Sequence, residues 1–164
     1  HMRNGGRPEL VYTDILQRDH RSLPKGIDVY CCGPPCQPFS TIGSQQNAQD
    51  SRFTVFLECI ETIRKSRPIT FIVENVPIAD QSTIALLRNA FLPLHSRYAI
   101  EDRVLNTKNF GLPQNRKRLY IVGMLRSHIE QEFVWPSPQH PPSLVEFLSL
   151  QRDGESDPLS KYAH

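Results

Sequence analysis

Short apolar runs recur along the chain and are separated by longer, more polar segments. The runs cover residues 10–15, 27–32, 69–73, 98–105 and 119–123. Each is four to eight residues long and bounded by polar or turn-forming residues, which is typical of strands. The run at 27–32 is apolar enough for a strand that is buried on both faces.

Two of the intervening segments carry apolar residues at helical spacing. The first helix is predicted from residue 53 and ends at Arg67-Pro68, and its apolar face holds Phe53, Phe56, Leu57, Ile60 and Ile63. The second is capped by Ser82 or Thr83, and its face holds Ile84, Leu87, Phe91 and Leu94. Residues 41–51 and 106–117 are polar loops, and Ser143 caps a short amphipathic piece at 144–150. Strands that alternate with helices predict an α/β fold with a parallel sheet.

Chemically capable side chains stand at the ends of three predicted strands. Asp14 ends the first strand, Cys36 follows the second and Glu74 follows the third. Ligands of open α/β sheets bind beyond the carboxyl ends of the strands, so these residues are expected to converge. Cys36 lies within the stretch GPPCQPFS, where prolines fix the backbone on both sides of the thiol. Such a stiff loop favours a nucleophile, although a packed thiol is the simpler alternative.

Composition and charge exclude few classes of protein or partner. The chain has 164 residues and a net charge of +2, so no global basic field indicates nucleic acid. Residues 97–126 nevertheless hold seven basic residues against two acidic ones, which fits either a phosphate-bearing partner or a solvated face. No apolar run approaches the length of a membrane span, and His1-Met2 resembles an expression scar.

The cysteines and histidines show no metal-ligand spacing, so no metal is expected. Cys31, Cys32 and Cys59 are interpreted as core residues, and their spacing fits neither a zinc site nor a disulfide scaffold. This usage, without a signal peptide, predicts a reducing intracellular location. That location would be the nucleus of a eukaryote or the cytoplasm of a bacterium.

Three motifs in order resemble those of the DNA cytosine-5 methyltransferases. They are GPPCQPFS at residues 33–40, ENV at 74–76 and QNRKR at 114–118. The resemblance covers residues 30–126 nearly without gaps, and TDI at 13–15 and DSR at 50–52 support it. It implies a Rossmann-like, S-adenosylmethionine-dependent methyltransferase sheet with helices on both faces.

The resemblance also assigns roles. Cys36 would add to C6 of a flipped-out cytosine, and Glu74 would hydrogen-bond or protonate N3. Arg118 would hold the base at O2 or the adjoining phosphate, and Arg116 would orient the acid and the phosphate. DNA rather than RNA is the implied partner, contacted by Gln37, Ser40, Gln114, Arg116 and Arg118. S-adenosylmethionine, which leaves as S-adenosylhomocysteine, would lie against Asp14, Ile15, Pro35 and Val55, and the loop at 41–50 would close over the base.

The chain departs from the family at both ends. It contains no Gly-x-Gly turn for the methionine part of the cofactor, and the family's ribose-binding acid and target-recognition region are also missing. We therefore expect an N-terminal arm at 1–7, a catalytic subdomain at 8–150 and a tail at 151–164, with a sheet incomplete at both ends. The exposed sheet edge predicts a complementary methyltransferase chain or self-association. The isolated chain is expected to bind the cofactor weakly.

Several alternatives stay open on the sequence alone. The nearest is the tRNA-methylating branch of the same family, which shares the GPPCQPF-like and ENV motifs. Another is a catalytically incomplete domain with a partner or regulatory role. At the level of residues, Asp14 could cap a helix that begins near Ile15, Glu74 could cap a turn, and residues 116–118 could be an exposed basic turn.

Overall fold

The computed structural model describes residues 11–35, 51–79, 81–139, 143 and 145. The chain falls into two compact units, which are treated separately. One consists of Asp14–Leu105 with Lys117–Trp135, and it contains the sheet. The other consists of His1–Thr13, Asn106–Arg116 and Pro136–His164. The expected loop at 41–50 and nearly all of the expected helix at 144–150 lie outside the described residues.

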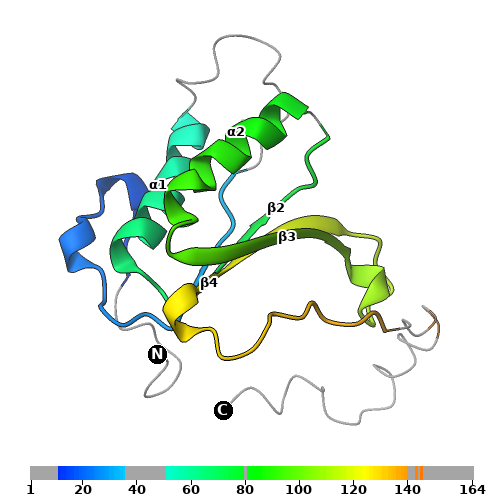
Figure 1. Cartoon of the computed structure of the whole chain (residues 1–164). Coiled ribbons are helices and arrows are strands. Elements are labelled where there is room, and N and C mark those ends of the chain that lie inside the picture. Colours follow the sequence, from blue (N-terminus) through cyan, green and yellow to red (C-terminus); the bar gives the residue numbers. More distant parts are fainter. Residues whose placement is uncertain (1–10, 36–50, 80, 140–142, 144, 146–164) are drawn as a thin grey trace, which may run out of the picture. The chain divides into compact units, whose positions relative to one another are not determined.

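A four-stranded sheet with the strand order β1-β2-β4-β3 forms the centre of the larger unit (Figure 1). The strands are β1 at Val29–Cys32, β2 at Thr70–Asn75, β3 at Tyr98–Asn106 and β4 at Lys117–Leu125. β1 and β2 run parallel, whereas β4 runs antiparallel to β2. The sheet is therefore mixed and not parallel throughout, because the loop at 107–116 returns the chain from β3 to β4 in the opposite direction.

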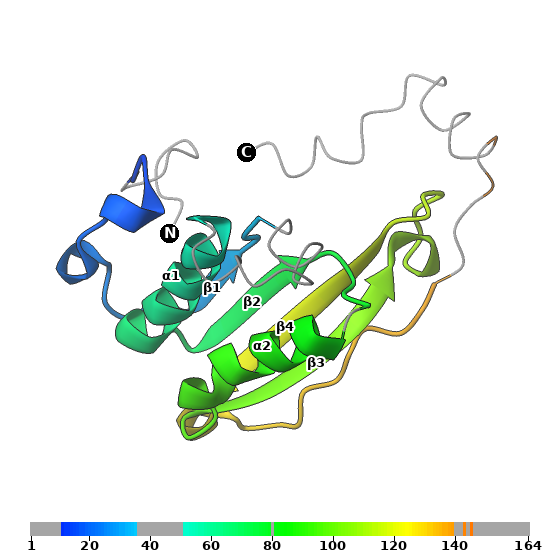
Figure 2. The same ribbon diagram turned by 90° about the horizontal axis from the view of Figure 1, so that it is seen from above.

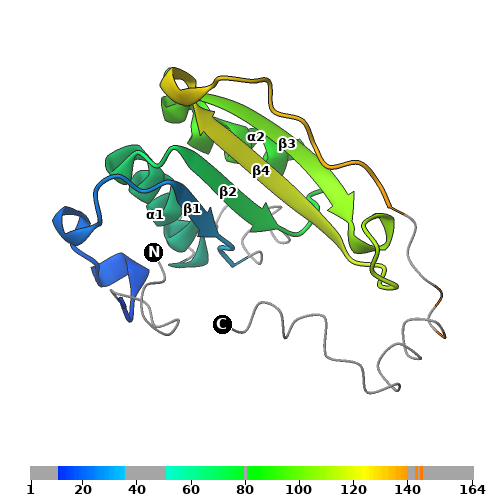
Figure 3. The same ribbon diagram turned by 90° about the horizontal axis from the view of Figure 1, so that it is seen from below.

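Two α-helices, α1 at Ser51–Ser66 and α2 at Gln81–Phe91, lie on the same face of the sheet (Figure 2). α1 connects the parallel strands β1 and β2, as a crossover must. The opposite face carries no α-helix within the described part of the chain (Figure 3). α2 begins at Gln81, so Ser82 and Thr83 lie inside its first turn and the predicted caps are wrong.

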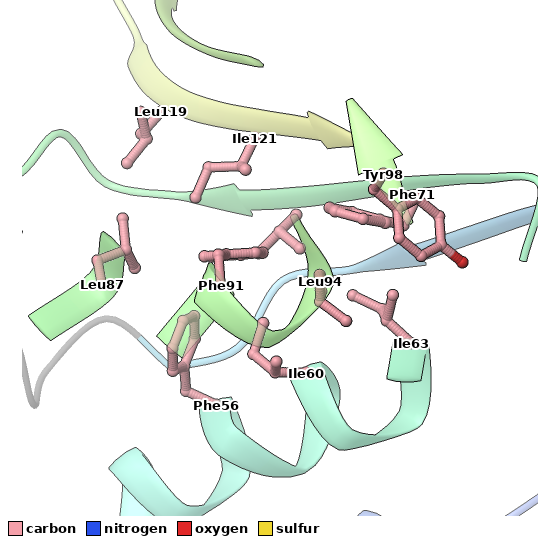
Figure 4. Close-up of a cluster of buried hydrophobic side chains, with 11 residues drawn as sticks. Phe56, Ile60, Ile63, Phe71, Leu87, Phe91, Leu94, Tyr98, Leu119 and Ile121 are labelled. Carbon is pink, nitrogen blue, oxygen red and sulfur yellow. The ribbon is translucent and has the colours of Figure 1, made fainter. Parts of the chain in front are cut away.

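The core lies between the helices and the sheet (Figure 4). Phe71 of β2 is its centre, with ring centroids 6.0 Å from Phe91 and 5.2 Å from Tyr98. The Tyr98 hydroxyl donates a hydrogen bond of 2.8 Å to the carbonyl of Pro68, which satisfies its polar end. The other buried apolar residues include Phe56, Ile60, Ile63, Val73, Leu87, Leu94, Leu119 and Ile121. The helical spacing therefore identified most of the buried faces of α1 and α2, but Leu57, which was expected on the buried face of α1, is 42% exposed.

Replacement of Gly123 by alanine should destabilise this core strongly. A Cβ at Gly123 would lie 2.1 Å from Cε1 of Phe71, whose ring is fully buried between β2 and the helices. Overpacking of this kind costs about 1–3 kcal/mol. Thermal unfolding of Gly123→Ala, Phe71→Leu and the double variant measures the effect. Because the smaller Leu relieves the clash, the double variant should lose less stability than the sum of the single variants. Additive losses would contradict the packing.

The expected strand at 10–15 does not form over the residues described there. Asp14 has extended backbone geometry, and its side chain accepts a hydrogen bond of 2.9 Å from the amide of Leu16. It thereby caps a short 3₁₀ helix, η1, at Ile15–Gln17. Helix capping was the alternative role predicted for Asp14. A second 3₁₀ helix, η2, follows at His20–Ser22, and both pack against α1.

Three further 3₁₀ helices complete the described elements: η5 at Leu92–Leu94, η6 at Thr107–Asn109 and η7 at Arg126–His128. Among the described residues, no helix is both long and apolar enough to cross a bilayer.

Candidate active site at the ends of the central strands

Three strand ends meet at one end of the sheet. β1 and β2 are parallel, so both end at the same edge of the sheet. Asn75 is the last residue of β2, and Gly33 directly follows β1. β4 runs the other way, so its first residues, Lys117 and Arg118, return to that edge. Gly33, Pro34 and Pro35 then lead the chain towards Cys36, which lies outside the described residues. The second and third predicted strands thus end at one edge, whereas Asp14 ends no strand; the convergence of Cys36 with Glu74 stays a prediction.

Glu74 is held at this edge by an ion pair with Arg118. Nε of Arg118 lies 2.9 Å from Oε1 of Glu74, and the exposed fractions of the two side chains are 22% and 36%. A second guanidinium nitrogen of Arg118 donates to the carbonyl of Lys117 at 2.7 Å, which restrains the fork. The carboxylate is thus oriented by a fixed cation, yet both groups remain open to a ligand.

Gly33 lies beside the carboxylate of Glu74. A Cβ on Gly33 would lie 3.4 Å from Oε2 of Glu74, in van der Waals contact with it. The carboxylate therefore lies between the backbone that precedes Cys36 and the guanidinium of Arg118. Sequence reasoning did not single out Gly33, although it opens the GPPC stretch.

Asn75 links the ends of β1 and β2. It is only 4% exposed, and its Nδ2 donates to the carbonyl of Pro34 at 3.3 Å. Its Oδ1 accepts from the amide of Val76 at 2.8 Å. This buried amide fixes the backbone that leads to Cys36 relative to Glu74. Sequence reasoning missed this role, and the only signal was the position of Asn75 inside the ENV motif.

The smaller unit contains a braced loop that carries Gln114 and Arg116. Oδ1 of Asn106 accepts from the amide of Arg116 at 3.1 Å, and its Nδ2 donates to Oδ1 of Asn115 at 2.8 Å. The amide of Thr107 donates to the carbonyl of Arg116 at 3.1 Å. Gln114 and Arg116 are both exposed on this loop, as DNA contacts would be. Asn106 was also missed, because a lone Asn before a loop carries no specific signal.

The predicted cofactor residues occupy several elements. Ile15 is half-buried in η1, Val55 is half-buried in α1, and Pro35 is exposed after β1. Asp14 uses Oδ1 as a helix cap, which leaves Oδ2 able to accept from an adenine amino group. The role of these residues in binding the cofactor stays a prediction.

The described cysteines differ in their surroundings. Cys59 is buried, Cys32 is partly buried and Cys31 is exposed. The prediction that Cys31 is a core residue is wrong, because neighbouring strand residues point to opposite faces and its face carries no helix. A hydrogen bond with Cys59, together with burial, raises the pKa of the Cys32 thiol well above its usual range. Cys32 therefore stays protonated and is a poor nucleophile.

Among the residues that the structure describes, no group of three or more His, Cys, Asp or Glu side chains could hold a metal ion.

Solved structures share the fold. A prophage-encoded protein of E. coli, described as a DNA modification methyltransferase, superposes with a TM-score of 0.60 at 24% identity over 77% of this chain and 38% of its own. The Dnmt2 methyltransferase of S. pombe gives a TM-score of 0.53 at 20% identity, over 93% of this chain and 45% of its own. The fold is therefore similar to part of these DNA methyltransferase structures, in agreement with the predicted α/β class.

Sequence comparison identifies the family. The profile of the C-5 cytosine-specific DNA methylases matches residues 2–162, and the chain belongs to this family. The type II methyltransferase M.HpaII of Haemophilus parainfluenzae is 36% identical over 150 residues, which are 88% of this chain and 41% of the relative. M.HhaI of Haemophilus parahaemolyticus is 31% identical over 91% of this chain and 45% of its own length. The chain thus spans less than half the length of these relatives.

Proposed function

We propose that the chain carries the catalytic centre for methyl transfer from S-adenosylmethionine to C5 of cytosine in DNA. The observation that supports this proposal is the Glu74–Arg118 pair, fixed beside the backbone that leads to Cys36. The chemistry needs a carboxyl group, a guanidinium and a thiol. Glu74 and Arg118 supply the first two at one sheet edge, and Cys36, the next residue after Pro35, would supply the third. Part of the cofactor site and the target-recognition region would come from segments that the relatives carry outside the matched region.

Cys36 and Glu74 have separate tasks in the proposed reaction. The thiolate of Cys36 forms a bond to C6 of cytosine, and Glu74 donates a hydrogen bond or a proton to N3 as negative charge builds on the ring. C5 becomes nucleophilic and takes the methyl group that the bound cofactor supplies. Solvent water then takes the C5 proton, the electron pair left at C5 forms the C5–C6 double bond and expels the thiolate of Cys36, and N3 returns its proton to Glu74. No oxidant or reductant is involved.

Arg118 serves two partners in this scheme. Its Nε holds Oε1 of Glu74, so the carboxyl group keeps one orientation towards N3. The remaining guanidinium donors can reach O2 of the base or the flanking phosphate. Gln37, Ser40, Gln114 and Arg116 would add contacts to DNA, and Arg116 would help to orient the acid and the phosphate. Asp14, Ile15, Pro35 and Val55 would hold the cofactor.

Methyl transfer to different nucleic acids tests this function. The chain in its full reading frame is incubated with tritiated S-adenosylmethionine and with duplex DNA, tRNA or no nucleic acid. We expect label in DNA only, at C5 of cytosine. Label in tRNA alone would replace the proposal with the tRNA-methylating branch. No transfer to either, with the cofactor bound in calorimetry, would favour a catalytically incomplete partner domain.

A further inference from the structure

A cluster of charged and polar side chains joins the segment after Asp14 to helix α1. The segment holds η1 and η2 and lies beside α1 (Figure 1, blue). Nη2 of Arg18 donates a hydrogen bond to Oγ1 of Thr62, which is fully buried on α1. The same nitrogen lies 3.9 Å from Oε1 of Glu58, and Nε2 of His20 lies 3.0 Å from that oxygen. These four residues, Arg18, His20, Glu58 and Thr62, form the Glu58 cluster.

The Glu58 cluster is nearly closed to solvent. The side chains of Arg18, Glu58 and His20 are 10%, 18% and 20% exposed, and Oε1 of Glu58 is buried. In such a cluster, desolvation offsets much of the attraction between the charges, so its net contribution to stability is small. Its contribution is geometric, because each buried charge needs its partner in one place. The cluster therefore fixes the position of the segment along α1.

The predicted cofactor residues lie next to the cluster on both of its sides. Asp14 is the N-cap of η1, Ile15 is the first residue of that helix, and Arg18 is its C-cap. On α1, Val55 and Glu58 are three residues apart, so they are neighbours on one face of the helix. The contact between Arg18 and Glu58 therefore sets where the η1 segment, residues 14–18, lies relative to Val55.

We infer that Arg18, His20 and Glu58 are positioning residues for the adenine ring of the cofactor. They hold the η1 segment against α1, so that Oδ2 of Asp14 stays aimed at the exocyclic amino group of the ring. Oδ1 of Asp14 is already used by the amide of Leu16, so this aim depends on the place of the whole segment. The inference rests on the proposed function, which places the cofactor against this segment.

Two ligands that differ only at the ring test this role. S-adenosylhomocysteine carries the amino group, whereas S-inosylhomocysteine carries a carbonyl oxygen on the same carbon, which the carboxylate of Asp14 would repel. In calorimetry on the protein in its full reading frame, the wild type should bind S-adenosylhomocysteine about tenfold or more tightly, as one hydrogen bond to a charged group allows. Glu58→Gln keeps the shape of the side chain and removes its charge. It should weaken S-adenosylhomocysteine on the order of tenfold and bring the two Kd values to within about twofold of each other.

A second variant and a matched control accompany Glu58→Gln. Arg18→Met removes the other half of the contact, so it should have the same effect, and the double variant should lose little more than either single one. Glu61→Gln also removes a carboxylate from α1, but Glu61 pairs with Arg64 of the same helix, so both affinities should equal those of the wild type. Turnover at saturating cofactor should hardly change in any of these variants, because none touches Cys36 or Glu74.

The ratio of the two Kd values separates positioning from a merely structural role. A general loss of stability, followed by thermal unfolding, would weaken both ligands alike and leave their ratio unchanged. The inference would be overturned by a wild type without preference, by a preference that persists in Glu58→Gln and Arg18→Met, or by its loss in Glu61→Gln as well.

Methyl transfer distinguishes failure of the inference from failure of the proposed function. If DNA is methylated and Glu58→Gln keeps the preference, only the inference falls. If the wild type binds neither ligand and transfers no methyl group, the proposed function falls and takes the inference with it. If the wild type shows the preference, Glu58→Gln loses it and neither protein methylates DNA, the inference stands and the proposed reaction falls.

Discussion

Replacement of Cys36 by alanine should abolish methyl transfer and remove covalent capture of DNA that carries 5-fluorocytosine. Fluorine at C5 cannot leave as a proton does, so the competent enzyme stays bonded to C6 through sulfur. Loss of the nucleophile should lower turnover by on the order of 10⁴-fold or more. Transfer of labelled methyl groups measures the rate, and denaturing electrophoresis detects the adduct.

Peptide mapping of the wild-type adduct provides the internal control. The modified peptide should contain Cys36 and leave Cys32 unmodified, because the hydrogen bond with Cys59 and burial raise the pKa of the Cys32 thiol. An adduct that persists in Cys36→Ala would assign the nucleophile to another thiol, such as the exposed Cys31.

Replacement of Glu74 by glutamine should lower turnover about 10²- to 10⁴-fold while the affinity for DNA changes little. The amide keeps the size of the side chain but cannot supply a proton to N3. Stability should hardly change, since the pair with Arg118 is partly exposed and such pairs contribute about 0–1 kcal/mol. Single-turnover kinetics, DNA-binding assays and thermal unfolding separate these effects.

Glu61→Gln is the matched control for this variant. Glu61 lies on α1 and pairs with Arg64 at 2.6 Å, so the substitution also removes a carboxylate from a partly exposed ion pair. Its turnover should equal that of the wild type. If Glu74→Gln were equally active, Glu74 would have only the structural role of capping a turn.

Local patterns predicted most of the elements because the hydrophobic period survives in each. The spacing of Phe56, Ile60 and Ile63 marks the buried face of α1, and all three lie in the core. The runs at 69–73, 98–105 and 119–123 fall within or almost within β2, β3 and β4. The direction of a strand could not be predicted in this way. The apolar pattern of residues 119–123 does not reveal that β4 runs antiparallel to β2.

The failures have local physical causes. A single short apolar run does not distinguish a strand from a turn, and in residues 10–15 the Asp14 cap decided in favour of η1. Cys31 resembled a core residue because its run is apolar except for Asp28, yet among the described residues the α-helices pack on one face of β1. The motifs located Glu74 and Arg118, but their contact depends on the reversal of β4, and the roles of Gly33 and Asn75 required coordinates.

Because β4 runs antiparallel to β2, the turns and loops of the sheet should differ in how well they tolerate an insertion. The Glu74–Arg118 pair lies where β1 and β2 end and β4 begins, whereas the turn at 95–97 joins η5 to the start of β3 at the opposite end of the sheet. His95, Ser96 and Arg97 are exposed there. A reporter domain inserted after Ser96 should therefore leave the Glu74–Arg118 pair undisturbed. The sheet thus offers a tagging position that is insulated from its reactive edge.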